Sequence, residues 1–284
     1  MNYSWAVKYI SEFFATAIFV LIGNGVIANV RLKGTKMTNA GWPVIAVGYG
    51  LALLVVSVMF GNVSGAHVNP AVTIGLAASG HFSWAHVLPY LVAQFFGAFF
   101  GQILLVAIYN TFFLNSRNPA NILSAFATVP TLDQQKRQSR GPILVATSTA
   151  EFIGTFVFVF GVLALTTHYF GAERVQTIVN QYKGTYTTAQ AFATISDVLS
   201  ASISLTYLTR GFLYGGLILA LGGVSGGAFN PVRDLSPRLL HHILPKSILG
   251  TGKGSSRWWY AWVPALIPIL GALAAAGLYI ILYR

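Results

Sequence analysis

The stretch NVSGAHVNPAVTIGLAASG, residues 62–80, decides the fold together with its counterpart GVSGGAFNPVRDLSPRLLH, residues 223–241. Each begins with glycine-rich sequence and passes through Asn-Pro into residues that favour a helix. Asn is a preferred helix N-cap and Pro is preferred at the first helical position, so each stretch predicts an extended approach followed by a short helix. Such backbone persists at membrane depth only where it is buried in protein or lines a water-filled cavity.

The sequence around these stretches has the composition of an integral membrane protein. Of the 284 residues, 55% are hydrophobic and 8% are charged, and the mean hydropathy is +0.66. Soluble domains carry about 25% charged residues, so this composition excludes a disordered chain, a nucleic-acid module and a water-soluble enzyme. The net charge of +11 comes from Lys and Arg scattered singly along the loops, which does not indicate a nucleic-acid partner. The chain has no cysteine, which excludes disulfides and zinc–thiolate sites.

The apolar sequence contains six stretches of the length that a transmembrane helix needs, roughly 20 residues for about 30 Å of hydrocarbon. They run approximately over residues 7–29, 42–61, 84–109, 145–167, 201–222 and 258–282. Together with the two interrupted stretches they predict an all-α membrane protein with six transmembrane helices and two re-entrant half-helices.

The two halves of the chain repeat each other. ISEFFATAIFVLIG at residues 10–23 matches TAEFIGTFVFVFG at residues 149–161, with Glu12 and Glu151 in register. Each copy leads to its own Asn-Pro element, and an odd number of spans in each half places the halves in inverted orientation. Paired interrupted segments in corresponding places indicate a site near the membrane midplane. The predicted repeats cover approximately residues 1–142 and 143–284.

At this point the motifs become recognisable. HVNPAV at residues 67–72 and AFNPVRD at residues 228–234 resemble the two signature boxes of aquaporins, the major intrinsic protein family. Two such boxes in inverted repeats are highly specific, and the resemblance covers nearly the whole chain. The box residues are Asn69, Pro70, Ala71, Asn230, Pro231 and Val232. Val232 stands where the family usually has Ala, at a position that in this family lies behind the pore wall.

Further residues resemble the glycerol-facilitator, or aquaglyceroporin, branch in its bacterial form. Asp234 follows Arg233 directly, Arg238 comes soon after, and SAFATVP at residues 124–130 is similar to a loop motif of that branch. The resemblance implies an aquaporin-like fold of six tilted helices, with two half-helices that meet end to end at the midplane. It also implies a homotetramer with one pore in each subunit.

Four positions form the narrowest filter in this family. Counted from the two Asn residues, they are Tyr49, Ile218, Gly227 and Arg233. The water-only pattern has Phe and His at the first two positions, so the resemblance implies a wider, one-sided apolar aperture with a single cation. Two positions depart from the best-known glycerol facilitators, which have Trp in place of Tyr49 and Gly in place of the bulkier Ile218.

Asn69 and Asn230 admit two interpretations, simple helix caps or pore residues, and their corresponding places favour the pore. There the backbone oxygens would cap the half-helices and the side-chain amides would donate to a permeant. The positive ends of the half-helices would repel cations.

Arg233 must face a polar cavity, because a charge in hydrocarbon costs roughly 2.5–3.5 kcal/mol or more. It would either pair with Asp234 or donate paired hydrogen bonds to the hydroxyls of a polyol, whose CH groups would contact Tyr49.

Three further titratable residues carry alternatives. His67 is a core histidine, a proton relay or a lumen residue, and the resemblance favours the lumen. Glu12 and Glu151 are either a proton-coupling relay or acceptors for the backbone N–H groups of their own glycine-rich loops, and their repetition favours the structural role. Arg210 is expected to extend toward the membrane interface. No pair of His has metal-site spacing, and no metal or cofactor is expected.

An even number of spans puts both termini on one side of the membrane. The family resemblance implies that this side is the cytoplasm and that the membrane is the plasma membrane. The distribution of Lys and Arg favours the opposite orientation. The loop at residues 168–200 is longer than is typical of the family and is a candidate gate.

The sequence therefore predicts one channel domain over residues 1–284, which conducts glycerol and other small uncharged solutes together with water and excludes ions and protons. One alternative is mainly a water channel, against which Asp234 and the missing filter His argue. Another is an ion- or proton-coupled secondary transporter. An enzyme is disfavoured, because no acid–base pair or nucleophile stands out. The sequence does not rank glycerol against urea, dihydroxyacetone, hydrogen peroxide or lactic acid.

Overall fold

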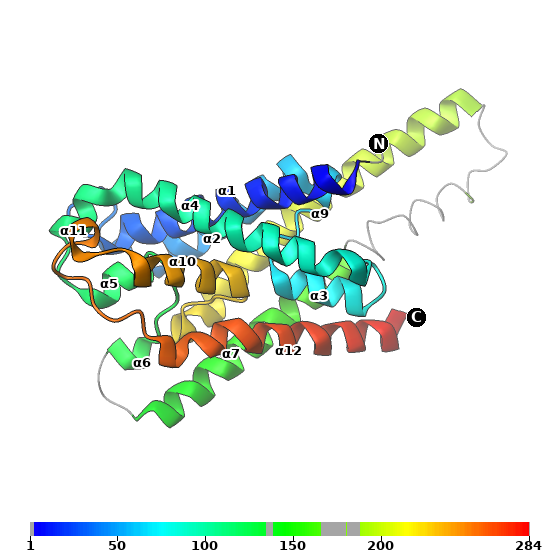
Figure 1. Ribbon diagram of the computed structural model, residues 1–284. Helices are drawn as coiled ribbons and strands as arrows, with labels where there is room; N and C mark the ends of the chain where they lie inside the picture. The colour runs from blue at the N-terminus through cyan, green and yellow to red at the C-terminus, as the bar shows by residue number, and fades with distance from the viewer. Residues whose placement is uncertain (1–2, 135–138, 166–179, 181–187, 284) are drawn as a thin grey trace.

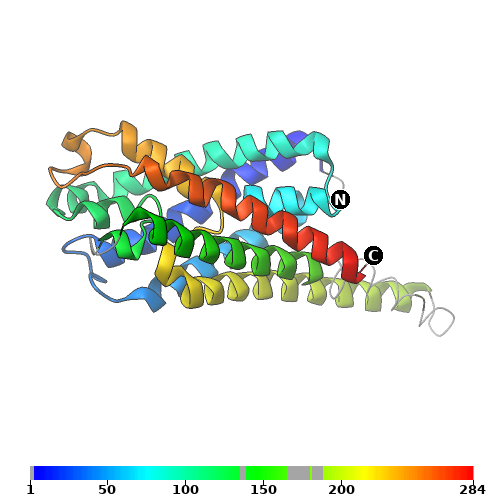
Figure 2. The same ribbon diagram turned by 90° about the horizontal axis from the view of Figure 1, so that it is seen from below.

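A computed structural model describes residues 3–134, 139–165, 180 and 188–283. Within these residues six helices are long and apolar enough to cross a membrane, which confirms the predicted number of spans (Figures 1 and 2). They are α1 (Trp5–Arg31), α2 (Trp42–Ser64), α4 (Val87–Asn115) with the preceding turn η1 (Trp84–His86), α7 (Arg140–Leu163), α9 (Thr188–Ser225) and α12 (Trp258–Tyr283).

Two short helices begin at the Asn-Pro motifs. They are α3 (Pro70–Ala78) and α10 (Pro231–Ile243), with Asn69 and Asn230 as their extended N-caps and Pro at the first helical position. Figure 1 shows these half-helices inside the bundle, pointing toward each other from its opposite ends. The predicted combination of six long helices and two half-helices is therefore the observed fold.

Both chain ends lie at one end of the bundle (Figures 1 and 2), as an even number of spans requires. Three short helices occupy the connections at the other end. They are α5 (Pro119–Ser124), α6 (Thr131–Gln134) and α11 (Lys246–Leu249). The end that carries α5, α6 and α11 is called the loop end below, and the other is called the terminal end.

Glycines allow the helix backbones to approach closely. A Cβ atom at Gly97 or Gly101 of α4 would overlap a backbone carbonyl oxygen of α1, at Phe13 and Ala17 respectively. The corresponding contact in the second half joins α12 to α7, where a Cβ at Gly271 would lie 2.6 Å from the carbonyl oxygen of Phe152. Small residues at such crossings are the usual means of helix packing in a bilayer, where the hydrophobic effect does not drive association.

The sequence-based boundaries differ from the structure most at the fifth span. Helix α9 begins at Thr188, so residues 188–200 are helical, whereas the sequence predicted a loop there. Figure 2 shows α9 extending beyond the rest of the bundle at the terminal end. The remainder of the expected 168–200 gate, apart from Asn180, lies outside the described residues.

The glycine contacts predict a stability effect. Gly101→Ala forces the backbones of α1 and α4 apart, and we expect it to cost about 1–3 kcal/mol because rigid backbone atoms must shift. The measurement is thermal unfolding of the purified protein in detergent. Gly277→Ala in α12 is the matched control, because no atom lies within 4 Å of its added methyl group. Equal unfolding temperatures for the two variants would contradict the packing account.

Candidate functional site

The carboxylate of Glu12 holds the loop that leads into α3. Its Oε1 accepts hydrogen bonds from Ser64 Oγ and the His67 backbone N–H, both at 2.8 Å. Its Oε2 accepts from the Val68 N–H at 2.9 Å and from Gln94 Nε2 at 2.8 Å. The side chain of Glu12 is fully buried. All of these partners are donors, so the site suits an ionised carboxylate that satisfies the backbone of an irregular loop.

Glu151 holds the loop that leads into α10 in the corresponding way. Its Oε1 accepts from Ser225 Oγ at 2.6 Å and from the Ala228 N–H at 2.9 Å, and its Oε2 accepts from the Phe229 N–H at 2.7 Å. Tyrosines add a second repeated contact, since the hydroxyl of Tyr90 donates to the Ser64 carbonyl and that of Tyr260 to the Ser225 carbonyl. The two loops are therefore built on one plan.

Both loops contain left-handed backbone at residues other than glycine. Ala66, Val68 and Phe229 have φ values of 44°, 45° and 46°. This conformation costs roughly 1–2 kcal/mol per residue for an L-amino acid. The backbone N–H groups of Val68 and Phe229 donate to Glu12 and Glu151, respectively. Their carbonyl oxygens accept from the Asn side chain of the other loop.

The two N-cap asparagines join the half-helices head to head. Asn69 Nδ2 donates to the Phe229 carbonyl and Asn230 Nδ2 donates to the Val68 carbonyl, both at 2.8 Å. Their side-chain oxygens accept from N–H groups in the first turns of α3 and α10. The side-chain oxygens therefore cap both half-helices, which was not expected from the sequence. The backbone oxygen of Asn69, which was expected to cap, accepts from the Thr73 N–H at 3.0 Å. An amide nitrogen carries two hydrogens, so each Asn retains one donor for a ligand.

The residues after each Asn form the first turn of a half-helix. Pro70 and Ala71 begin α3, while Pro231 and Val232 begin α10, and all four are buried. Val232 is 5% exposed and belongs to the apolar cluster between the half-helices and the surrounding spans. Its larger side chain is accommodated by packing.

The four expected filter residues form two pairs. The guanidinium carbon of Arg233 lies 4.9 Å from the centre of the Tyr49 ring. A Cβ on Gly227 would lie 3.4 Å from Cγ1 of Ile218, so these two residues are direct neighbours. Arg233 is 1% exposed, yet its Nε and Nη1 have no hydrogen-bond partner among the described residues. Buried donors without a partner indicate a place where a ligand or water is bound.

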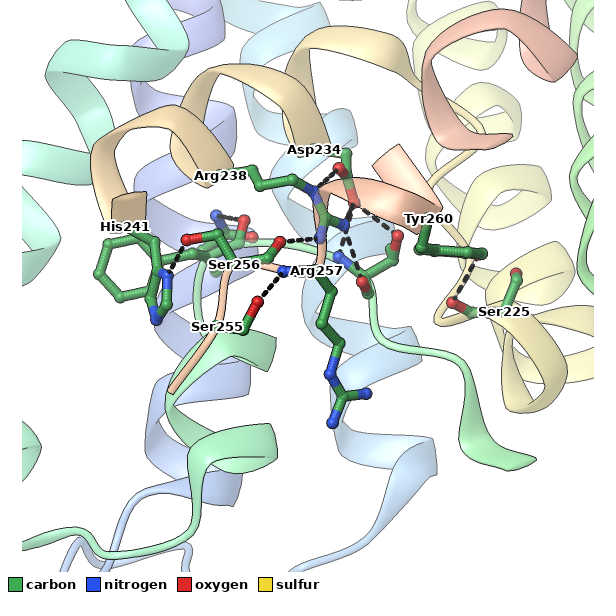
Figure 3. A network of polar contacts seen from close by, with 11 residues as sticks. Ser225, Asp234, Arg238, His241, Ser255, Ser256, Arg257 and Tyr260 are labelled. Atoms are coloured by element: carbon green, nitrogen blue, oxygen red, sulfur yellow. Dashed lines mark hydrogen bonds and ion pairs between the residues drawn. The ribbon is translucent and has the colours of Figure 1, made fainter. Parts of the chain in front are cut away.

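Asp234 pairs with Arg238, not with Arg233. Its Oδ1 lies 2.7 Å from Arg238 Nε, and its Oδ2 accepts from the backbone N–H and the hydroxyl of Thr128 at 2.7 and 2.5 Å (Figure 3). Arg238 also donates to the carbonyls of Thr128 and Ser256. These bonds fasten residues 124–130 to α10. The alternative of an Arg233–Asp234 ion pair therefore finds no support in the described residues.

A cavity of about 210 Å³ lies at the loop end and leads to Arg233. It is lined in part by Trp42, Ile45, Thr128 and Gly226. The fastened 124–130 segment contributes to its wall. The cavity has the position of a vestibule in front of the expected filter residues, of which Arg233 lines it.

His67 lies at the other end of the site, in the loop before α3. It is 6% exposed, its Nδ1 is 3.1 Å from Thr73 Oγ1, and its ring lies 4.9 and 5.0 Å from the rings of Phe82 and Tyr90. These contacts fix its orientation.

Sequence reasoning missed three polar residues that support the site. The Tyr49 hydroxyl donates to Asn24 Oδ1, and Asn24 Nδ2 donates to Gln102 Oε1 at 2.7 Å. Tyr214 donates its hydroxyl to the Ala228 carbonyl at 2.9 Å. Each stands in an apolar span, where a polar side chain is costly, and this signal could have identified it. Among the described residues no group of three or more His, Asp or Glu side chains is placed to hold a metal ion.

Arg210 was misplaced by the sequence analysis. Its side chain does not extend to the membrane interface but is buried, with 3% exposure. Its Nη1 and Nη2 donate to the carbonyls of Gly65 and Ala66, at 3.1 and 2.9 Å. Arg210 is buried because it lies on the face of α9 that is turned toward the loop before α3.

Comparison with known proteins gives a consistent result. The family model described as "Major intrinsic protein" matches residues 2–179 and 183–279. The "Glycerol facilitator-aquaporin gla" of Lactococcus lactis subsp. cremoris is 45% identical over 293 residues, with 100% of both chains covered. The "Glycerol uptake facilitator protein-like 5" of Lactiplantibacillus plantarum is 37% identical, with 100% of this chain and 99% of the relative covered. The solved structure of the aquaglyceroporin from Plasmodium falciparum aligns with a TM-score of 0.68 and 26% identity, covering 98% of this chain and 97% of that one.

The contacts of Glu12 predict a structural effect of its replacement. Glu12→Gln presents an NH₂ group to partners that are all donors, so we expect a loss of about 1–3 kcal/mol in stability. Glu151→Gln should act in the same way in the other half, and thermal unfolding in detergent measures both. Wild-type stability of the Glu12 variant together with loss of proton-driven uptake would instead identify a coupling group.

Proposed function

The chain belongs to the major intrinsic protein family, and on this basis we propose that it is a passive channel for glycerol and other small uncharged solutes. It is an integral, multi-pass membrane protein and a channel, not an enzyme. The observation that carries the proposal is Arg233, a buried guanidinium with two donors that have no partner among the described residues, beside the aromatic ring of Tyr49.

This arrangement matches the chemistry of a polyol. The hydroxyl groups of glycerol lie along one edge and its CH groups along the other. Nε and Nη1 of Arg233 would donate to successive hydroxyl oxygens, because a guanidinium presents its donors in a fixed fork. The ring of Tyr49 and the side chain of Ile218 would contact the CH edge. Gly227 leaves the space that a larger residue would fill.

Selectivity at the midplane would come from the two asparagines and the half-helices. Each free amide hydrogen of Asn69 and Asn230 would donate to a hydroxyl or a water molecule, so that a permeant accepts two hydrogen bonds there. This orientation interrupts a proton-conducting chain of water. The N-termini of α3 and α10 both face this point, and their positive ends disfavour cations. We infer that water passes by the same path and that ions and protons are excluded.

The transporter alternative is weakened by the glutamates. Both oxygens of Glu12 and both oxygens of Glu151 are occupied by donors from their own loops. A coupling carboxylate must exchange protons with the transport path, which these contacts oppose. The water-only alternative is weakened by Asp234, which accepts hydrogen bonds from Thr128 and so holds in place a residue that lines the vestibule.

Other features belong to the same proposal. The chain would be one channel domain with inverted repeats at about residues 1–142 and 143–284, supported by the matching contacts of Glu12 and Glu151. It would form a homotetramer in the plasma membrane, with both termini in the cytoplasm. Urea, dihydroxyacetone, hydrogen peroxide and lactic acid are further candidate solutes, since all are small, neutral and able to form hydrogen bonds.

Stopped-flow light scattering on proteoliposomes tests the function. We expect the vesicles to re-swell rapidly in glycerol after the initial shrinkage, at a rate that rises linearly with the glycerol gradient. Vesicles without protein and an impermeant osmolyte are the controls. Saturation with uphill uptake would indicate a transporter, and shrinkage without re-swelling would indicate a water channel.

A substitution at the filter gives a sharper prediction. Ile218→Ala removes apolar bulk beside Gly227, so we expect permeability to solutes larger than glycerol, such as erythritol, to rise by about tenfold while water permeability changes less. Such a change corresponds to about 1.4 kcal/mol in the barrier. Leu219→Ala is the matched control. Leu219 is the next residue in α9, and its side chain is 52% exposed. If the two variants have the same solute profile, the filter lies elsewhere.

A further inference from the structure

Arg210 has hydrogen-bonding capacity beyond the two bonds that hold the loop before α3. Nη1 and Nη2 donate to the loop carbonyls of Gly65 and Ala66, but Nε has no partner among the described residues. The side chain of Arg210 is buried, with 3% exposure. A buried charged donor that remains unsatisfied costs free energy, which a bound acceptor would recover. The guanidinium therefore has a free donor at membrane depth.

The position of Arg210 corresponds to that of a filter residue. Arg210 precedes Asn230 by the same number of residues by which Tyr49 precedes Asn69. The filter, with Tyr49 and Arg233, lies toward the loop end. Helix α2 ends at Ser64, toward the terminal end (Figure 1). The carbonyls of Gly65 and Ala66, which Arg210 binds, follow directly and so lie on that side of the asparagines. The protein thus has buried arginines on both sides of the Asn pair.

Ser57 supplies a second unsatisfied group. It precedes Asn69 by the same number of residues by which Ile218 precedes Asn230. Ser57 has no exposed surface, and its Oγ has no hydrogen-bond partner among the described residues. A serine in a helix usually satisfies its hydroxyl by bonding to the helix backbone or to water. Its isolation in an apolar span indicates a ligand that is not a protein group.

Contacts between α2 and α9 put Ser57 and Arg210 at the same depth. A Cβ on Gly211 would lie 2.6 Å from Leu54 Cβ, and a Cβ on Gly61 would overlap the ring of Tyr207. Ser57 lies between Leu54 and Gly61, as Arg210 lies between Gly211 and Tyr207. Ser57 is three residues from Leu54 and four from Gly61, and Arg210 is three residues from Tyr207. These are the spacings of neighbours on one helix face, so both residues lie beside the contact between the two antiparallel helices.

We propose that Arg210 and Ser57 form a second solute-binding site, on the side of the asparagines opposite Arg233. Nε of Arg210 donates to a hydroxyl oxygen of a neutral polyol, and Ser57 Oγ exchanges a hydrogen bond with the same or the adjacent hydroxyl. The site rests on the proposed channel function. It places a fixed positive charge on each side of the midplane, so that a cation meets two barriers and a polyol meets two sets of donors.

A purely structural role for Arg210 is the competing explanation. The two Nη atoms alone brace the loop, and this role requires neither Nε nor Ser57. Ser57→Ala separates the two explanations, because the serine hydroxyl has no protein partner to lose. A structural role predicts no effect of this change on transport.

The experiment is glycerol and water flux in proteoliposomes for wild type, Ser57→Ala and Arg210→Lys, with thermal unfolding measured in parallel. We expect Ser57→Ala to lower glycerol permeability about fivefold, the effect of one lost hydrogen bond, with an unchanged unfolding temperature. We expect Arg210→Lys to keep the exclusion of cations and to lose glycerol flux, since it retains the charge without the fork. Thr209→Ala is the control, because its hydroxyl bonds to the Leu205 carbonyl of its own helix.

Two failures remain distinguishable. If the wild type conducts no glycerol, the proposed function is wrong. If the wild type conducts glycerol and Ser57→Ala conducts it equally fast, the second site is wrong while the channel stands. A change only in the unfolding temperature of Arg210→Lys, with normal flux, would also overturn the second site and assign Arg210 to bracing alone.

Discussion

Two stretches of irregular backbone lie at membrane depth, and the rest of the structure depends on how their polar groups are satisfied. Hydrocarbon offers no hydrogen bonds, so each unpaired N–H would cost several kcal/mol. Glu12 and Glu151 meet this requirement by accepting the N–H groups of His67, Val68, Ala228 and Phe229. The asparagines then occupy the loop carbonyls of the opposite half. With the loops held in this way, the half-helices can meet at their N-termini.

The distribution of satisfied and unsatisfied polar groups then supports the proposed path of the solute. The described residues bury three acidic side chains, Glu12, Glu151 and Asp234, and all three are bonded to several donors. They bury three arginines, of which Arg238 is saturated by Asp234 and backbone carbonyls. Arg233 and Arg210 retain free donors. The acids therefore hold the scaffold together, and we propose that the unsatisfied donors bind hydroxylated solutes.

The sequence predicted the features that have a local or repeated signature. Asn-Pro after a glycine-rich lead specified both half-helices, and the registered Glu12 and Glu151 indicated their structural role. Other features depend on the helix face or on distant partners. Arg210 was expected at the interface, since a single sequence does not say which face of α9 turns inward. The bond between Asn24 and Gln102 joins separate spans and has no local signal. The start of α9 was missed, because a helix that continues past the apolar region has no hydropathic signature.

The most direct test is an experimental structure determined in the presence and absence of glycerol. The account predicts a glycerol molecule at the filter, with hydroxyl oxygens at hydrogen-bond distance from Nε or Nη1 of Arg233 and with its CH edge against Tyr49 and Ile218. The filter should hold water alone when glycerol is absent. A structure with glycerol in which the guanidinium of Arg233 is paired to a protein carboxylate, and no solute lies beside it, would contradict the central claim.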